Sequence, residues 1–198
     1  MLSFRYHSTN CFFLKSSPND RLVAVDAGWP GTLYEYAREM KKIGCHLEDV
    51  GWAMATHFHM DHAGLVGELL SRGVTCVVFE NQMTAIDAME KTIEKNTPVY
   101  VRIARERLRP LETRESRSFF GELGIDGEVV ITDYHSPDSV SLVLDSGEAV
   151  VGDLPPADQG MPDDVRLQRV WDILRSKGVR RVYPGHAGAF DLGEKGGI

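Results

Sequence analysis

The sequence predicts an α/β (α+β) fold in which two β-sheets pack face to face and helices cover their outer sides. Short apolar runs bounded by turn residues fill the first and last thirds of the chain, and amphipathic helical patterns follow them. Strands, helices, strands and helices in that order favour two packed sheets. No repeat, low-complexity tract or clear linker interrupts the 198 residues. We therefore expect residues 1–198 to form a single domain.

Each expected element of the first half has its own pattern and boundary. The turn sequence Ser-Ser-Pro-Asn-Asp separates the first two apolar runs, which indicates an antiparallel pair of strands. Apolar side chains recur on one helical face between Thr32 and Lys42, and Gly44 ends that helix. In chain order we expect strands at about 11–14 and 22–25, a helix at 32–42, a strand at 50–56, a helix at 63–70 and a strand at 75–79.

The middle of the chain, about 82–122, is expected to be mainly helical and to lie over one edge of the sheets. Pro98 ends its first helical pattern. The last third returns to strands, with Asp145-Ser146-Gly147 as a hairpin turn. We expect helices at about 81–95 and 113–123, strands at 128–132, 139–144 and 148–151, a helix at 164–177 and a strand at 180–183.

Composition narrows the class of protein. The formal net charge of −7 argues against a nucleic-acid partner, which demands a concentrated basic surface. Arginines recur between 102 and 117, and we interpret them as a solvated face beside acidic neighbours, with a patch that attracts an anionic substrate or partner as the alternative. The start lacks a secretory signal and no run approaches the length of a membrane span, so we expect a cytoplasmic protein without membrane contact. Cys11, Cys45 and Cys76 are expected to be buried, reduced thiols.

The strongest functional signal is Thr56-His57-Phe58-His59-Met60-Asp61-His62, in which three histidines and one aspartate stand within six residues after an apolar run. His57 and His59 are separated by one residue, so an extended backbone points both imidazoles to the same side. Asp61 and His62 then open the next helix. Imidazole and carboxylate together suit zinc, iron or manganese better than calcium. The segment predicts a metal site.

Three further candidate ligands each lie where an expected strand runs into a loop: His135, Asp153 and His186. A rigid sheet can aim side chains from such positions. His7 and His46 lie outside this pattern, and we interpret them as ordinary surface residues.

In the order and spacing of these residues, the chain resembles the metallo-β-lactamase superfamily over nearly its whole length. The His-x-His-x-Asp-His signature is matched at 57–62, and the aspartate after an early strand is matched by Asp26. The later histidine, aspartate and histidine are matched by His135, Asp153 and His186. The resemblance implies a four-layer αβ/βα sandwich with a two-metal site at one edge of the sheets.

The resemblance also implies a role for each residue. His57, His59 and His135 would hold the first metal ion. Asp61, His62 and His186 would hold the second, and Asp153 would bridge the two. Asp26 would orient a ligand or its loop. The cofactors expected are two divalent metal ions, zinc first, with iron or manganese as alternatives.

We expect a metal-dependent hydrolase that uses a two-metal-activated water to cleave an ester, thioester, lactone or related bond in a small molecule. Asp61 is the expected catalytic residue, because it could orient the nucleophile or pass a proton to the leaving group. Two enzyme alternatives stay open: a glyoxalase II-like thioesterase, and a mononuclear iron dioxygenase that acts on a persulfide. A non-catalytic metal-binding protein is a third. The sequence leaves the oligomeric state open.

Substrate choice is expected to depend on residues 81–120 and on the loop after Asp153, where Leu154-Pro155-Pro156-Ala157 could form a wall of the pocket. The residues before His135 depart from the Thr-Pro-Gly that is common in the superfamily, which could bring Tyr134 near the substrate. Tyr100 and Phe119 could add apolar surface, but core packing is the favoured interpretation for both.

Overall fold

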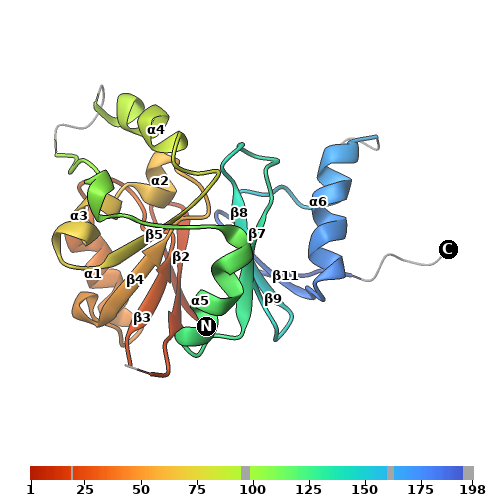
Figure 1. Ribbon diagram of the computed structural model, residues 1–198, viewed down its shortest axis with the longest axis horizontal. Coiled ribbons are helices and arrows are strands. Elements are labelled where there is room, and N and C mark those ends of the chain that lie inside the picture. The colour runs from red at the N-terminus through yellow and green to blue at the C-terminus, as the bar shows by residue number, and fades with distance from the viewer. Residues whose placement is uncertain (19, 95–98, 160–162, 194–198) are drawn as a thin grey trace.

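The computed structural model describes residues 1–18, 20–94, 99–159 and 163–193. Figure 1 shows two sheets side by side, with helices on the outside of each. The six-stranded sheet has the order β1 (Leu2–Tyr6), β2 (Thr9–Lys15), β3 (Leu22–Val25), β4 (Val50–Met54), β5 (Thr75–Phe79), β6 (Arg109–Leu111). The five-stranded sheet has the order β11 (Phe190–Asp191), β10 (Arg181–Pro184), β9 (Glu148–Gly152), β8 (Val140–Leu144), β7 (Gly127–Ile131).

The helices connect and cover these strands. Three short 3-10 turns lie at Leu47–Asp49, Arg105–Arg107 and Thr113–Glu115. The α-helices are α1 (Leu33–Lys42), α2 (Met60–Ala63), α3 (Val66–Ser71), α4 (Ala85–Glu94), α5 (Ser116–Glu122) and α6 (Val165–Ser176).

Three buried apolar clusters separate four layers. The first fills the space between the six-stranded sheet and α1, α3 and α4, with Tyr36 and Met40 of α1 fully buried. The second joins the inner faces of the two sheets, for example Phe12 and Leu142. The third packs α6 through Trp171 against the outer face of the five-stranded sheet. This is the αβ/βα sandwich expected, and the fold prediction is confirmed.

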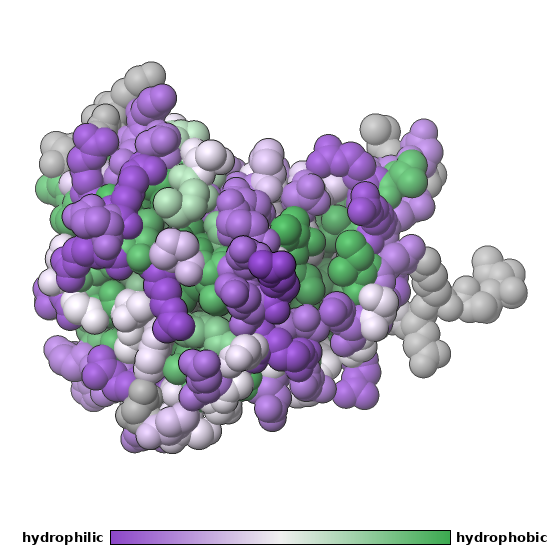
Figure 2. All heavy atoms as spheres, in the orientation of Figure 1, coloured by the Kyte–Doolittle hydropathy of each residue, from purple (hydrophilic) through white to green (hydrophobic). Residues whose placement is uncertain are grey.

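Hydrophilic side chains cover much of the face viewed in Figure 2, with hydrophobic ones gathered in smaller areas between them. Several arginines of the 102–117 stretch pair with acidic side chains: Arg105 with Asp87 at 2.6 Å, and Arg117 with Asp145 at 3.0 Å. The three cysteines are free and buried. The charged surface is therefore a mixed one rather than a basic patch.

The structure departs from the expected elements at three strands and one helix. The sequence patterns do not predict β1, β6 or β11, and β6 places a strand inside the segment 82–122. β6 is three residues long and contains Pro110, which is tolerated because it lies at the edge of its sheet. The helix expected at 63–70 is two short helices, α2 and α3, with Gly64 between them. A Cβ at Gly64 would lie 2.3 Å from the carbonyl oxygen of Met60 and 2.4 Å from the nitrogen of Pro30, so only glycine fits there.

Candidate metal centre

All seven predicted ligands lie where strands of the two sheets end, and the structure brings them together. His57 and His59 follow β4, and α2 then carries Asp61 and His62. The second sheet supplies the others: His135 comes after β7, Asp153 after β9 and His186 after β10. Residues up to 129 positions apart thus meet at one edge, His57 and His186 being the ends of the set.

The ligand atoms fall into three overlapping groups, within each of which all atoms lie within 4.8 Å of one another. The groups are His57, His59, His135; His57, His62, Asp153; and Asp61, His62, His186. In the first group, His59 Nδ1 lies 3.1 Å from His57 Nε2 and 3.2 Å from His135 Nε2. In the third, His186 Nε2 lies 3.2 Å from His62 Nε2 and 3.1 Å from Asp61 Oδ2.

We call the first and third groups the two histidine sets: His57, His59 and His135 form one, and Asp61, His62 and His186 form the other. The carboxylate of Asp153 lies between them. Its Oδ2 is 3.7 Å from His57 Nε2 and 3.6 Å from His135 Nε2. Its Oδ1 is 3.2 Å from His62 Nε2 and 3.3 Å from His186 Nε2. One oxygen therefore faces each set, which is the geometry of a bridging carboxylate.

The arrangement fits bound cations because it leaves an acceptor without a donor. Among the described residues, Asp153 Oδ1 is buried and has no hydrogen-bond partner. A buried carboxylate oxygen without a partner is strongly destabilising. His62 commits its Nδ1 to Asp26 at 2.8 Å, so its Nε2 is the nitrogen that faces the same Asp153 oxygen and would be unprotonated when it ligates a metal ion. Two facing acceptors are stabilised by a positive charge between them.

The pKa of each buried group reports the same electrostatics. Burial lowers the pKa of His62, but Asp26 and Asp153 outweigh burial and raise it to about 10. Burial lowers the pKa of His57 to about 2, with the charge of His62 acting in the same direction. Burial works to raise the pKa of Asp153, but His62 outweighs it and holds the carboxyl ionised. His57 is thus a neutral imidazole facing an ionised carboxylate, as metal ligation requires, whereas a bound cation would replace the Nε2 proton that Asp26 and Asp153 favour on His62.

Asp26 fixes the position of the candidate ligands that follow β4 of the six-stranded sheet. It is fully buried, and its φ of +66° puts it in the left-handed region that few non-glycine residues adopt. Its Oδ1 accepts the Thr56 N–H at 2.7 Å, and its Oδ2 accepts from the Thr56 hydroxyl and from His62 Nδ1. Asp26 therefore fixes both the start of the 57–62 segment and the orientation of one imidazole.

The turn between β1 and β2 fixes the last imidazole. The carbonyl oxygen of Ser8 accepts from His186 Nδ1 at 3.0 Å, which leaves Nε2 free to face Asp61 and Asp153. Thr9 is fully buried and its hydroxyl lies 3.5 Å from Asp61 Oδ2. No sequence signal points to these contacts, because they join positions far apart in the chain through backbone geometry.

His7, which precedes Ser8 in this turn, contacts Glu35 and is not part of the centre.

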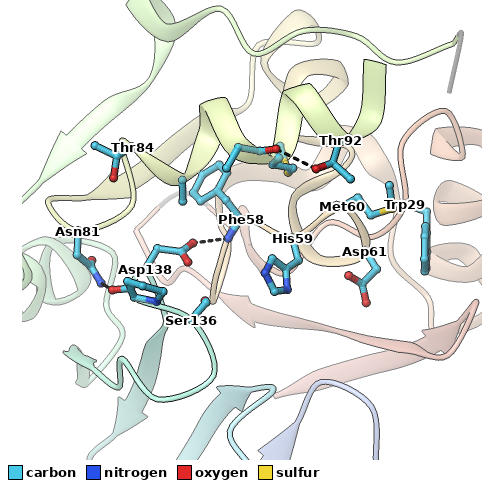
Figure 3. A pocket seen from close by; sticks show the side chains of 14 residues that line it. Trp29, Phe58, His59, Met60, Asp61, Asn81, Thr84, Thr92, Ser136 and Asp138 are labelled. Atoms are coloured by element: carbon cyan, nitrogen blue, oxygen red, sulfur yellow. Dashed lines mark hydrogen bonds between the residues drawn. The ribbon is translucent and has the colours of Figure 1, made fainter. Parts of the chain in front are cut away.

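A pocket of about 660 Å³ opens beside the centre, beneath α4 (Figure 3). His59 and Asp61, one from each histidine set, both line it. The loop after β7 closes another side, where the Asp138 carboxylate accepts the Phe58 N–H at 2.6 Å. The remaining lining comes chiefly from α4 and the residues just before it, with Trp29 added from the loop after β3.

Three expectations about the pocket can be compared with this lining. The described lining includes neither Tyr134 nor any of Leu154–Ala157. Tyr134 donates its hydroxyl to Asp164 at the start of α6, so the expectation that it reaches the substrate pocket is wrong. The 154–157 loop turns toward α6 instead, where the Pro155 carbonyl accepts from Trp171 Nε1. Phe119 is buried in the core between the sheets, and Tyr100 bonds Glu90, in line with core packing for both.

The fold and the His/Asp clusters define a metal-dependent hydrolase. The chain belongs to the metallo-beta-lactamase superfamily, whose profile matches residues 5–186. No curated protein sequence matches the chain.

Solved structures share the fold at low sequence identity. TTHA1623 in a di-iron-bound form superposes with a TM-score of 0.69 at 18% identity, covering 96% of this chain and 93% of that one. The metallo-beta-lactamase family protein TTHA1429 from Thermus thermophilus gives 0.63 at 21% identity, covering 95% and 72%. A mutant of B. thuringiensis AiiA with N-decanoyl-L-homoserine bound at the active site gives 0.60 at 15% identity, covering 90% and 80%.

Across residues 1–18, 20–94, 99–159 and 163–193, no helix is both long and apolar enough to cross a bilayer.

Proposed function

We propose that this chain binds two divalent metal ions, zinc first, and hydrolyses an ester, thioester or lactone bond in a small molecule. The observation that carries the proposal is the position of Asp153, whose two carboxylate oxygens each face a different histidine set. His57, His59 and His135 would hold one ion, and Asp61, His62 and His186 the other. Five imidazoles and two carboxylates form a donor set that zinc, iron and manganese all accept.

When bound, two such ions supply a water of lowered pKa and polarise the carbonyl that it attacks. The chain's own residues set the geometry around that chemistry. Asp26 and the Ser8 carbonyl each hold one imidazole in a single tautomer. The Thr9 hydroxyl lies beside Asp61 Oδ2 and limits how that carboxylate turns.

Asp61 is the proposed catalytic residue, because it lines the pocket as well as the metal centre. In the reaction, the oxygen of water forms a bond to the carbonyl carbon and the bond to the leaving oxygen or sulfur breaks. One proton of the water passes to the leaving group, and the Asp61 carboxylate is placed to carry it.

The test combines metal content with turnover. Protein stripped by a chelator is reloaded with zinc, iron or manganese, and metal ions per chain are counted by mass spectrometry. Each form is then assayed against neutral esters, thioesters and lactones. We expect two ions per chain, metal-dependent hydrolysis, and loss of at least about a hundredfold in kcat/KM in His57→Ala.

Iron needs its own arm in this experiment, because the similar structure of TTHA1623 is described in a di-iron-bound form. Two irons with hydrolysis would change the metal and keep the reaction. A single iron per chain with oxygen uptake on a persulfide would overturn the hydrolytic proposal in favour of a dioxygenase. Metal binding with no turnover of any substrate would indicate a non-catalytic role.

A further inference from the structure

The pocket beneath α4 has an apolar wall and a polar floor. Its apolar lining, which we call the α4 pocket wall, consists of Trp29, Phe58, Met60, Ala85, Ala88 and Met89. Ala85 and Ala88 lie one turn apart on α4, with Met89 beside them. In Figure 3, α4 crosses above His59 and Asp61, with Trp29 at one end and Asn81 at the other. The pocket therefore runs along the helix and passes over the metal centre.

The formal charges on the described pocket lining are all of one sign. That lining includes two carboxylates, Asp61 and Asp138, and no lysine or arginine. Asp138 already accepts the Phe58 N–H and is 5% exposed. Away from the metal centre, an anionic group of a substrate would find no cationic side chain to pair with, and would lose hydration against apolar side chains. The wall thus disfavours carboxylates and phosphates.

The position of the pocket says which part of a substrate it would hold. His59 and Asp61 come from different histidine sets and both line the pocket floor. A carbonyl that lies over the centre would direct one of its substituents along α4. Mainly apolar concave sites of this size with a few polar groups are typical of small-molecule sites.

We propose that the α4 pocket wall binds the uncharged hydrocarbon chain of an acyl group, so that the substrate is a neutral aliphatic acyl ester or thioester. The inference rests on the proposed function for its reaction: water supplies the hydroxyl of the fatty acid released, and the leaving alcohol or thiol takes the second proton. Ala85 and Ala88 leave the space for the chain, because a larger side chain at either position would project into the pocket.

The first arm of the test is a chain-length series of neutral phenyl esters and N-acetylcysteamine thioesters, from acetyl to octanoyl, with the metal-loaded enzyme. We expect kcat/KM to rise by up to about fourfold for each added methylene, the factor that burial of one such group implies. An octanoyl analogue that carries a terminal carboxylate should be at least tenfold worse than octanoyl itself.

Variants on α4 locate the effect. Ala88→Phe should lower the octanoyl-to-acetyl ratio of kcat/KM by at least about tenfold, and Ala85→Leu should do so independently. Lys91→Phe is the matched control, because Lys91 is exposed on the same helix and does not line the pocket. Its ratio should equal that of wild type. Thermal melting of each variant confirms that the fold is kept.

Binding gives a readout that needs no turnover. Calorimetry should show that octanamide binds the metal-loaded protein at least tenfold more tightly than butanamide, with the difference reduced in Ala88→Phe. Hydrolysis with a flat chain-length profile would overturn this inference and leave the proposed function standing. Octanamide binding that depends on Ala88, without hydrolysis of any substrate, would uphold the pocket and overturn the proposed function. A preference for the carboxylated analogue would overturn the inference outright.

Discussion

Gly185 lies against the metal centre so closely that its missing side chain is part of the site. A Cβ there would stand 2.6 Å from Asp153 Oδ1 and 2.6 Å from His62 Cε1, so both candidate ligands would have to move. We expect Gly185→Ala to weaken metal binding by about ten- to a hundredfold while the fold is kept. The measurement is metal ions per chain after dialysis against a competing chelator.

Gly188 provides the matched control for that substitution, because a Cβ at Gly188 meets no heavy atom within 4 Å. Gly188→Ala should bind metal as wild type does. Equal metal retention in Gly185→Ala and Gly188→Ala would show that the candidate ligands are not held as tightly as the distances indicate.

Asp26 contributes through its charge as well as its shape. Asp26→Asn keeps an oxygen acceptor for the Thr56 N–H but places an NH2 donor, in place of a charged carboxylate oxygen, against His62 Nδ1. We expect metal affinity to fall by about ten- to a hundredfold, measured by chelator competition. Asp158→Asn, at an exposed position, should leave the affinity unchanged. Unchanged affinity in Asp26→Asn would mean that the hydrogen bond to His62 does not tune the centre.

At the residue scale, the sequence predicts which side chains meet and misses most of what holds them. The chemistry of His57, His59, Asp61 and His62 is readable because the four stand together in the chain. Ser8 could not be foreseen as a partner of His186, since its contribution is a backbone carbonyl. The expectation for Tyr134 fails for a related reason: its partner Asp164 lies in another element, 30 residues on.

At the scale of elements, the attachment of α4 to the segment after residue 99 depends on one buried side chain, that of Glu90. Glu90 is 3% exposed and accepts the Ile103 N–H at 2.9 Å, the Tyr100 hydroxyl at 3.0 Å and an Arg102 N–H at 3.3 Å. These bonds fasten α4 to the segment that follows residue 99. Burial works to raise the pKa of Glu90, but these donors outweigh it and hold the pKa below the ordinary value of 4.5.

The lowered pKa predicts how this attachment depends on pH. Because the folded-state pKa lies below the unfolded value near 4.5, ionised Glu90 stabilises the fold above that pH. The contribution is lost as the pH falls through the folded-state pKa. Glu90→Gln should lower the free energy of unfolding by about 2 kcal/mol at pH 7, from urea denaturation.

The difference between wild type and Glu90→Gln should shrink steadily between pH 5 and pH 3. Glu122→Gln is the control at an exposed position, and its difference from wild type should stay small at every pH. A Glu90→Gln difference that is constant or grows toward pH 3 would mean that the carboxylate does not act as its contacts indicate.

Sequence patterns predict an element correctly where periodicity extends over many residues. They fail where a segment becomes a strand only because a neighbouring strand pairs with it. The ten-residue helix α1 and the β8–β9 hairpin follow their patterns directly. β1 carries alternating side chains but becomes a strand by pairing with β2 along five residues. β6 is a strand because β5 lies beside it, and nothing in Arg-Pro-Leu favours that state.

Viewed as a whole molecule, the sandwich brings ligands from both sheets to one edge. The side of the first sheet supplies four of the seven candidate ligands and the second supplies three. Bound metal should therefore stabilise the packing of the two sheets as well as the local loops. Any ligand that binds only the folded state adds to its stability, by about 2.7 kcal/mol when its concentration is a hundred times its Kd.

We accordingly expect the melting temperature to fall when a chelator removes the metal and to recover when zinc is returned, measured by calorimetry at fixed protein concentration. Asp153→Ala, which removes the carboxylate shared by both sets, should respond to zinc much less than wild type. An equal melting temperature with and without metal would indicate that the sheets pack independently of the centre.

The contact between Ser8 and His186 also orders events during synthesis. The two residues are 178 positions apart, so the turn that fixes His186 leaves the ribosome long before the imidazole it serves. A nascent chain exposes the 57–62 ligands while the second-sheet ligands are still unmade. Tight capture of a metal pair, and any reaction that depends on it, must wait until His186 has been translated.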